Sequence, residues 1–485
     1  MASIQRTLGS GIAFTAVAKY SNIFFSIFIG AILARLLTPA EFGIVAIVTV
    51  FVSFFNLLTN FGIGPAVVQN RDLSKEDIRS IFSLSILLGI FFAGCFFLSS
   101  SIIAGFYNEP DLVNVVRLLS VAILFYSMQI VPHALNQKKL RFKQLGIISV
   151  TVQLFSGSLA IILAYQGFSY YALVFKSIFD GLATLIAFYW LAPVKITFNI
   201  RMEAFRKIAR FSSFQFMFNF INYFSRNADS LLIGKFFSAA ALGYYDKSYR
   251  LMTLPVSNLT HVITPVLMPV LSEFQHDKQR IYLIYIKVVR ILATIGFPLS
   301  IFLYFSAPEI IYIIYGPQWD QSIPVFKLLA LTVGIQMVLS SSGSIYQAVN
   351  RTDLLFYAGF LGAILMVGGI SYGVFIGESL ESIGYGLIFA FTTNFFVGFY
   401  MLIKLSLKSS YSFFLKTFLF PLAISLGMAL TLGLSTFLYH PDNLFLSLLL
   451  KIVVAGITFG LMFIIPRENR ELLNRYVGKY LKRSK

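Results

Sequence analysis

The chain contains 485 residues, of which 58% are hydrophobic and 12% are charged. Soluble domains carry about 25% charged residues, so this composition excludes an ordinary water-soluble globule and indicates a protein solvated by hydrocarbon. The formal net charge of +18 is a property shared with nucleic-acid-binding proteins. Here the basic residues lie in short loops between apolar runs, a distribution that argues against nucleic acid as a partner.

The apolar runs are long enough for helices that cross a bilayer. Each extends over about 20 residues or more, whereas a spanning β-strand needs only about 10. The first run is too long for the apolar region of a signal peptide and is therefore kept as a span. The sequence predicts fourteen helices, at residues 11–37, 42–69, 79–105, 112–136, 145–165, 170–190, 206–235, 241–271, 281–305, 322–347, 355–375, 383–403, 415–437 and 444–465.

The charges of the loops predict the orientation of these helices. Lysine and arginine are concentrated in every second loop, for example at residues 138–143 (KKLRFK), and in the tail after residue 466. The other loops are acidic or neutral, as at residues 108–111 (NEPD). Because basic loops mark the cytoplasmic side, both termini are predicted to be cytoplasmic. The predicted fold class is an all-α polytopic membrane protein of about fourteen transmembrane helices.

An internal repeat divides these helices into two halves. The segment LARLLTPAEFG at residues 33–43 falls on IGKFFSAAALG at residues 233–243, so that Arg35 corresponds to Lys235. Further along, at a slightly larger offset, RLL beginning at Arg117 falls on KLL beginning at Lys327. Each repeat holds six helices, and an even number keeps both halves in the same orientation. Transporters use such parallel repeats to place a substrate site between two halves.

The repeat predicts how the chain is organised. The segment between the halves alternates apolar and basic residues, which is typical of a helix lying in the membrane interface. The predicted parts are an N-terminal six-helix lobe at residues 1–193, an amphipathic interfacial linker at 194–211, a C-terminal six-helix lobe at 212–403, and a terminal helix pair with a basic cytoplasmic tail at 404–485.

Ionisable and polar residues inside the predicted spans are candidates for a substrate cavity, because charge in hydrocarbon is costly. Lys176 and Asp180 are spaced to pair at i, i+4. Arg35 and Lys235 lie near helix ends, where extension toward the headgroups is an equally good explanation. A net positive cavity would attract an anionic substrate, and arginine suits bidentate contact with phosphate. The candidates are Arg250, Arg226, Asp229, Lys176, Asp180, Lys19, Lys247, Asp246, Arg35, Lys235, Asn60, Asn222 and His261.

The sequence has no pattern typical of an enzyme. The four histidines lack metal-ligand spacing, and no Walker-type phosphate loop is present. The single cysteine, Cys95, excludes a disulfide within the chain. We therefore expect no catalytic residue, no metal and no cofactor. A polysaccharide polymerase would need a large outer loop, whereas the longest outer connection, residues 306–321, is short.

Three segments resemble the polysaccharide-transport branch of the multidrug/oligosaccharidyl-lipid/polysaccharide flippase superfamily, in particular Wzx-type exporters of O-antigen and colanic-acid repeat units. They are LARLLTPAEFG (33–43), FGIGPAVVQ (61–69) and LNQKKLRFK (135–143). The resemblance extends over essentially the whole chain. It implies a flippase in the bacterial cytoplasmic (inner) membrane. Such a protein translocates a polyprenyl-diphosphate-linked oligosaccharide by alternating access through a central cationic cavity.

A fourth segment, YYDKSYRLMTLP (244–255), is similar to the eighth helix of lipid II flippases. The resemblance implies that Arg250 belongs to the substrate cavity, as the matching arginine does in those proteins. Residues 21–34 carry no charge, unlike the first helix of lipid II flippases, which favours a different glycan.

The resemblance also implies the partners of the chain. These are an undecaprenyl-diphosphate-linked glycan, membrane lipids and the polysaccharide polymerase machinery. It leaves open whether a proton gradient, a sodium gradient or the membrane potential drives transport. The alternatives are a multidrug/cation antiporter of the same superfamily, whose cavity should be acidic, and a membrane polysaccharide polymerase.

Overall fold

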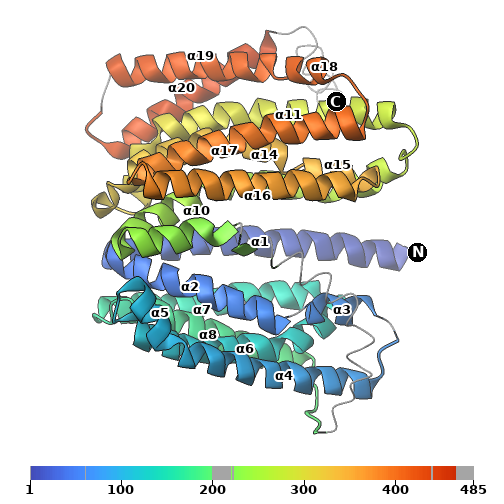
Figure 1. Cartoon of the computed structure of the whole chain (residues 1–485), viewed down its shortest axis with the longest axis vertical. Coiled ribbons are helices and arrows are strands. Elements are labelled where there is room, and N and C mark those ends of the chain that lie inside the picture. The colour runs from blue at the N-terminus through green and yellow to red at the C-terminus, as the bar shows by residue number, and fades with distance from the viewer. Residues whose placement is uncertain are drawn as a thin grey trace, which may run out of the picture. The chain divides into compact units, whose positions relative to one another are not determined.

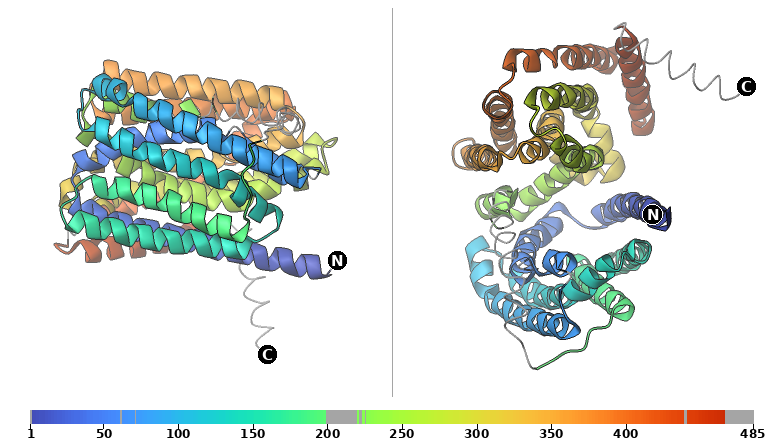
Figure 2. Two further views of the ribbon diagram at one scale, coloured as in Figure 1. Left: turned by 90° about the horizontal axis from the view of Figure 1, so that it is seen from below. Right: turned by 90° about the vertical axis from the view of Figure 1, so that its right-hand side faces the viewer.

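The computed structural model describes residues 2–60, 62–70, 72–198, 220, 223–224, 226–438 and 441–465. Within these ranges the regular structure is entirely helical, without a β-strand. The chain divides into two compact units, which we call the N-terminal unit (Met1–Gly243) and the C-terminal unit (Tyr244–Lys485). Within each unit the long helices run side by side (Figure 1 and Figure 2).

The N-terminal unit consists mainly of long helices, with two short ones of seven and eight residues. Residues 226–236 near its end are helical as well, and α10 (Ala239–Ser272) begins in this unit and continues into the next. Its other helices are α1 (Ala2–Leu36), α2 (Pro39–Asn60), α3 (Ile63–Gln69), α4 (Lys75–Leu98), α5 (Ser100–Tyr107), α6 (Leu112–Lys138), α7 (Phe142–Tyr165) and α8 (Tyr171–Leu191).

The C-terminal unit combines long helices with several short ones. Its elements after α10 are α11 (Lys278–Phe305), α12 (Ala307–Ile314), the 3₁₀ turn η1 (Pro317–Trp319), α13 (Ser322–Leu331), α14 (Val333–Leu339), α15 (Ser342–Ala348), α16 (Thr352–Phe375), α17 (Leu380–Tyr400), the π-helix η2 (Met401–Ser406), α18 (Tyr411–Lys416), α19 (Leu419–Leu438) and α20 (Leu444–Ile464).

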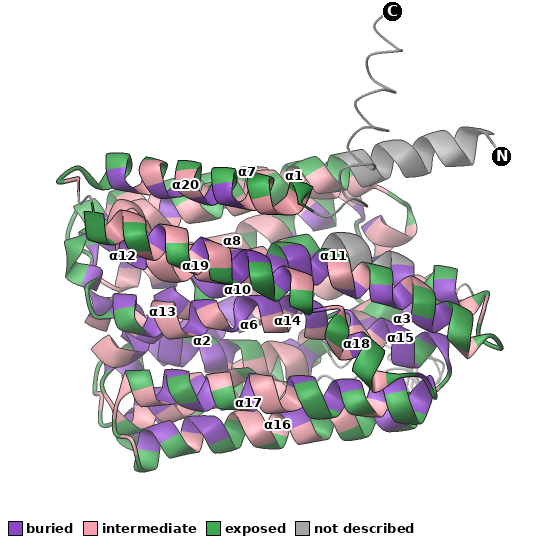
Figure 3. Cartoon of the chain, turned by 90° about the horizontal axis from the view of Figure 1, so that it is seen from above, coloured by how far each residue is buried: buried purple, intermediate pink, exposed green. Residues whose placement is uncertain are grey.

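The helices have the length and surface of membrane spans. Eleven in the described ranges are long and apolar enough to cross a bilayer, and a bent pair formed by α13 and α14–α15 brings the number to twelve. On α19 the side chains of Leu422, Leu426, Leu430 and Leu434 follow one another at four-residue intervals and are 48–68% exposed. Such an apolar stripe is suited to lipid. Along many long helices exposed residues alternate with buried ones (Figure 3). The predicted all-helical membrane class is confirmed.

The observed helices overlap the predicted ranges in the described part of the chain, but four predicted helices are interrupted, one of them near its start, between α18 and α19. The range 42–69 breaks near Gly62, whose φ of 70° is a conformation that glycine adopts without strain. The range 79–105 breaks at Ser99, where α4 ends and α5 follows. The range 322–347 bends by 43° between α13 and α14. Hydrophobicity alone does not register these breaks.

Some predicted parts fall on residues that the structure does not describe. Most of the predicted linker 194–211, the first part of the predicted helix 206–235, and the tail after residue 465 lie outside the described ranges. The connection 306–321 is short, as predicted, and it contains α12 and η1.

Local hydrogen bonds explain the sequence TPAE at the start of α2. The Thr38 backbone N–H donates to Glu41 Oε2 at 2.6 Å, and the Glu41 N–H donates to Thr38 Oγ1 at 3.3 Å. Pro39 occupies the first helical position, where its missing N–H costs nothing. This reciprocal arrangement is a capping box. The segment is therefore a helix start, and it fixes where α1 ends and α2 begins.

In the C-terminal unit, α16 and α17 approach each other closely at two glycines. A Cβ atom on Gly386 would lie 2.1 Å from the carbonyl oxygen of Gly369, and a Cβ atom on Gly369 would lie 2.4 Å from that of Gly386. No side chain fits at either position. Small residues that allow such backbone contact are a common way to pack helices in membranes.

Candidate substrate cavity

A polar cavity lies inside the N-terminal unit and has two adjoining chambers. Chamber 1 has a volume of ≈ 590 Å³ and chamber 2 a volume of ≈ 670 Å³, and both include His133 and Gln137 in their walls. Chamber 1 lies between α2, α3, α6 and α8, and its other lining residues are Asn56, Thr59, Asn60, Gly64, Pro65, Tyr126, Gln129, Ile130, Thr184 and Phe188. Chamber 2 lies between α1, α6 and α7.

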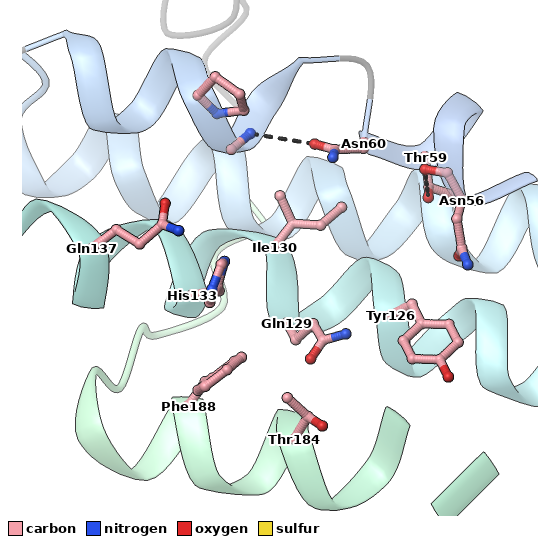
Figure 4. Close-up of a pocket in the computed structure, with 12 residues that line it drawn as sticks. Asn56, Thr59, Asn60, Tyr126, Gln129, Ile130, His133, Gln137, Thr184 and Phe188 are labelled. Atoms are coloured by element: carbon pink, nitrogen blue, oxygen red, sulfur yellow. Dashed lines mark hydrogen bonds between the residues drawn. The ribbon is translucent and has the colours of Figure 1, made fainter. Parts of the chain in front are cut away.

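Helix α6 supplies the polar wall of chamber 1. Gln129, His133 and Gln137 follow at four-residue intervals, so their side chains lie on one face of the helix. Figure 4 shows this face between α8, which carries Phe188, and the segment of α2 and α3 that carries Asn60. The cavity thus receives side chains from elements far apart in the sequence.

The break between α2 and α3 adds further polar groups to chamber 1. Asn60 ends α2, and its Oδ1 accepts a hydrogen bond of 3.4 Å from the Gly64 N–H in the first turn of α3. The carbonyl oxygen of Asn56 accepts a bond from Thr59 Oγ1, but the side-chain Oδ1 of Asn56 is buried without a hydrogen-bond partner in the described part of the chain. The predicted cavity residue Asn60 therefore lines a polar cavity, partly in a structural role.

Chamber 1 is neutral and has two aromatic walls. The rings of His133 and Phe188 lie 4.8 Å apart between centroids, and the Tyr126 hydroxyl donates to the Ser177 carbonyl oxygen at 3.1 Å. Among its lining residues that the structure describes there is no lysine, arginine, aspartate or glutamate. An ion or a phosphate would lose its hydration here without gaining a charged partner.

Chamber 2 contains Lys19, the one lysine, arginine or acidic residue among its described lining residues. Three of its polar residues, Asn22, Ser149 and Gln153, are linked by hydrogen bonds. Asn22 Nδ2 donates to Ser149 Oγ at 2.8 Å, and Gln153 Nε2 donates to the Asn22 carbonyl oxygen at 2.9 Å. The Asn22 side-chain Oδ1 is buried without a hydrogen-bond partner within the described ranges. Chamber 2 therefore offers one exposed cation in a polar setting.

The predicted pair on the sixth helix is formed. Lys176 Nζ and Asp180 Oδ2 lie 2.6 Å apart on α8, and about a quarter of each side chain is exposed. Thr184, one turn further along α8, lines chamber 1. The predicted pairing is confirmed, whereas a role of this pair in binding stays a prediction.

The C-terminal unit holds a second group of predicted residues, on α10. Arg250 Nε lies 2.8 Å from Asp246 Oδ2, and 61% of the arginine side chain is exposed. Lys247 is buried, and its Nζ lies 5.5 Å from the ring centroid of Tyr315 and 5.7 Å from that of Trp319. The aromatic faces stabilise the buried ammonium group. Arg250 can accept an anion, while Lys247 is held inside the protein.

Lys235, Arg35, Arg226 and Asp229 are not among the lining residues of either chamber. Lys235 Nζ donates to the Phe106 carbonyl oxygen and lies 4.6 Å from the Phe106 ring centroid. Arg35 and Arg226 are exposed, and Asp229 is buried with its Oδ1 accepting from the Ser230 N–H at 2.7 Å. His261 belongs to α10, and Asn222 lies outside the described residues.

Two features were missed by the sequence analysis. The first is the row Gln129, His133 and Gln137 on α6, which a count of polar residues at i, i+4 and i+8 would have found. The second is a buried ion pair of 2.5 Å between Lys451 Nζ of α20 and Glu309 Oε1 of α12, each with 8% of the side chain exposed. Nothing in the sequence links these residues, which are 142 positions apart.

The described ranges contain no cluster of three or more histidine, cysteine, aspartate or glutamate residues that could hold a metal ion. The long apolar helices and the polar cavity together define a multi-pass membrane protein of the transporter type. A family model described as polysaccharide biosynthesis protein matches residues 32–324, which is more than half of the chain. The chain belongs to this family, and the family predicted from the sequence motifs is confirmed.

Two relatives match almost the entire chain. It is 26% identical to the teichuronic acid biosynthesis protein TuaB of Bacillus subtilis over 442 residues, covering 90% of this chain and 91% of the relative. It is 24% identical to the lipopolysaccharide biosynthesis protein WzxC of Escherichia coli over 433 residues, covering 87% and 86%. Their names agree in placing them in the biosynthesis of cell-surface polysaccharides.

A solved structure shares the fold. The lipid II flippase MurJ in an inward closed conformation matches with a TM-score of 0.75 and 16% sequence identity, covering 95% of this chain and 100% of that chain. At this identity the match shows the fold and not the substrate.

Proposed function

We propose that the chain is a flippase that translocates a polyprenyl-diphosphate-linked oligosaccharide, a repeat unit of a cell-surface polysaccharide, across the bacterial cytoplasmic membrane. One observation carries the proposal: a member of a polysaccharide biosynthesis family has, over 95% of its length, the fold of a lipid II flippase. The chain is a multi-pass membrane protein, as predicted.

The chemistry of the two units supports such a substrate. A lipid-linked repeat unit combines a diphosphate, which needs cationic partners, with neutral sugars, which need hydrogen bonds. Lys19 in chamber 2 and Arg250 on α10 present exposed cations. Chamber 1 presents neutral polar groups. In this proposal Lys19 in the N-terminal unit and Arg250 in the C-terminal unit each offer a contact for the diphosphate within their own unit, and Asp246 orients Arg250 through their 2.8 Å ion pair.

The proposal includes the finer organisation predicted from the sequence. It places fourteen helices in two six-helix lobes, at residues 1–193 and 212–403, with a terminal pair after residue 404. Both termini lie in the cytoplasm. Transport proceeds by alternating access, coupled to an ion gradient or to the membrane potential. The loop charges and the repeat support this arrangement.

The test is reconstitution of the purified chain with its lipid-linked repeat unit in vesicles. Accessibility of the sugar to an external lectin should rise with time only in vesicles that contain the protein. Arg250→Ala should abolish this transport and also abolish complementation of a strain that lacks its own flippase, while the protein stays in the membrane. Arg280→Ala is the matched control, because it removes the same kind of side chain at a different place. Arg280 lies over the Phe274 ring at the start of α11. Transport by Arg250→Ala at the wild-type rate would remove this arginine from the site.

The same vesicles test the alternative of a multidrug/cation antiporter. That function predicts efflux of an organic cation driven by a proton or sodium gradient, with no movement of the glycan. The neutral lining of chamber 1 and the lone lysine of chamber 2 do not favour a cationic substrate. Cation efflux without lectin accessibility would overturn the proposed function.

A further inference from the structure

The polar row of α6 faces chamber 1 without hydrogen-bond partners in the described part of the chain. For the side chains of Gln129, His133 and Gln137, the described part of the chain supplies no hydrogen bond, although each side chain lines chamber 1. The buried Oδ1 of Asn56, on the opposite wall, lacks one as well. Asn136, also on α6, is by contrast paired with the carbonyl oxygens of Pro132 and Phe188.

Unpaired polar groups inside a membrane protein are costly. A buried amide without a hydrogen bond costs about 1–3 kcal/mol, and this applies to the buried Oδ1 of Asn56. Gln129, His133 and Gln137 are half-buried and line chamber 1, so their hydrogen-bond partners are supplied by whatever occupies the chamber, water or a ligand. The groups differ in kind: amides both donate and accept, and a neutral imidazole does the same through its two nitrogens. Their natural complement is a ligand rich in hydroxyl groups, each of which also donates and accepts.

The lining excludes other kinds of ligand. Without a lysine, arginine or acidic residue among its described lining residues, chamber 1 cannot compensate a phosphate or an organic cation. Its volume of ≈ 590 Å³ lies within the range of about 300–1,000 Å³ typical of small-molecule sites. The rings of Phe188 and Tyr126 offer flat apolar faces beside the polar row. A sugar ring has this combination, with hydroxyl groups at its edge and C–H groups on its face.

We propose that chamber 1 is a binding site for neutral sugar residues of the translocated glycan. This inference rests on the proposed function and assigns its glycan to a particular place. Gln129, His133 and Asn56 bind sugar hydroxyl groups, and Phe188 packs against a ring face. Chamber 2 shares His133 and Gln137 with chamber 1 and is also lined by Lys19. A diphosphate attached to the first sugar therefore lies toward Lys19.

The internal repeat supplies an independent argument. The offset of 210 residues between Arg117 and Lys327 also relates Gln137 to Gln347. At the same offset Gln129 corresponds to Leu339 and His133 to Gly343. Two of the three polar groups are therefore absent from the second repeat. A row needed merely to hold the fold together would be expected in both halves, whereas a ligand site can belong to one.

The test compares two probes on the full chain in lipid nanodiscs. One probe is undecaprenyl diphosphate. The other is the lipid-linked repeat unit that accumulates in the source bacterium when this gene is deleted. The variant Gln129→Leu/His133→Leu should bind the glycan-bearing lipid about tenfold more weakly, as expected for two lost hydrogen bonds. Its affinity for undecaprenyl diphosphate should not change. Gln347→Leu, the counterpart of the third row residue in the second repeat, should behave as wild type with both probes.

The outcomes separate this inference from the proposed function. If wild-type protein binds the glycan-bearing lipid and the double variant binds it equally well, chamber 1 is not the sugar site while the flippase function stands. If the double variant loses both lipids equally, the row supports the fold and the inference is also wrong. If wild-type protein neither binds nor transports the glycan-bearing lipid, the proposed function itself fails.

A second measurement does not depend on those substitutions being tolerated. The chain has a single cysteine, Cys95, so Cys95→Ala followed by Gln129→Cys places one thiol in the wall of chamber 1. Alkylation of this thiol by N-ethylmaleimide should be slowed by the glycan-bearing lipid and not by undecaprenyl diphosphate. Equal protection by both lipids, or by neither, would contradict the inference.

Discussion

The ion pair between Lys451 and Glu309 connects α20 to α12. Its removal tests how much this connection stabilises the protein. Glu309 Oε1 accepts from Lys451 Nζ at 2.5 Å and from Ser447 Oγ at 2.7 Å. Lys451 Nζ also donates to the Phe305 carbonyl oxygen at 2.8 Å. Glu309 Oε2 is buried without a hydrogen-bond partner in the described ranges. Each charge depends on the other as its partner, since only 8% of either side chain is exposed.

Replacing Lys451 with methionine keeps the length of the side chain and leaves the Glu309 carboxylate buried without its cation. Breaking a buried pair in this way costs about 3–5 kcal/mol. For a unit of this size 1 kcal/mol corresponds to about 2–4 °C in Tm, so the expected loss is roughly 6–20 °C. Glu309→Gln should also destabilise the protein, because it leaves the ammonium group buried without its anion.

The double variant Glu309→Gln/Lys451→Met removes both charges and should recover most of the loss, since neutral replacement of a buried pair is often without cost. The assay is thermal unfolding of the purified protein, followed by the loss of the monodisperse peak in gel filtration. Arg351→Met is the control, because the Arg351–Asp353 pair of 2.8 Å is largely exposed and should contribute little. A Tm of Lys451→Met equal to wild type, or a double variant no better than the single one, would refute the reasoning.

Two further predictions address packing and topology. Gly386→Ala should lower the Tm in the same unfolding assay, because the added Cβ forces α17 away from Gly369. Gly359→Ala on α16 is the control and should leave the Tm unchanged, because no atom lies within 4 Å of its added Cβ. Equal effects of the two substitutions would contradict the close contact. A reporter enzyme that works only in the cytoplasm should be active when it is fused after Arg351 and inactive when it is fused after Gly377. A reporter that works only outside the cytoplasm should give the opposite result. The reverse pattern would break the fourteen-helix topology.

The positions of the helices were largely predictable because they depend on hydropathy, which is averaged over many residues. About 20 apolar residues are needed to cross the bilayer, and a single exception within them changes little. The breaks depend on one or two residues instead. Gly62, with its positive φ, interrupts the predicted helix 42–69, yet it contributes almost nothing to the mean hydropathy that predicted the helix.

The polar groups were harder to predict because their meaning depends on their partners. The Lys176–Asp180 pair was foreseen, since both residues share one helix and their spacing fixes the geometry. Lys451 is a single lysine in a 21-residue apolar helix, and its partner Glu309 lies far away in the sequence. Lys235 was predicted as a cavity residue and contacts Phe106. The sequence reveals that a charge is present in a span but not which distant atom compensates it.

The two predicted repeats differ in their polar residues. At the offset of 200 residues, the counterparts of Asp246, Lys247 and Arg250 are Ala46, Ile47 and Val50, which are apolar and buried. The charged group thus belongs to the second helix of the second repeat alone, while the neutral polar row belongs to the fourth helix of the first. A substrate with a charged part and a neutral part needs two different kinds of site, which identical halves could not provide.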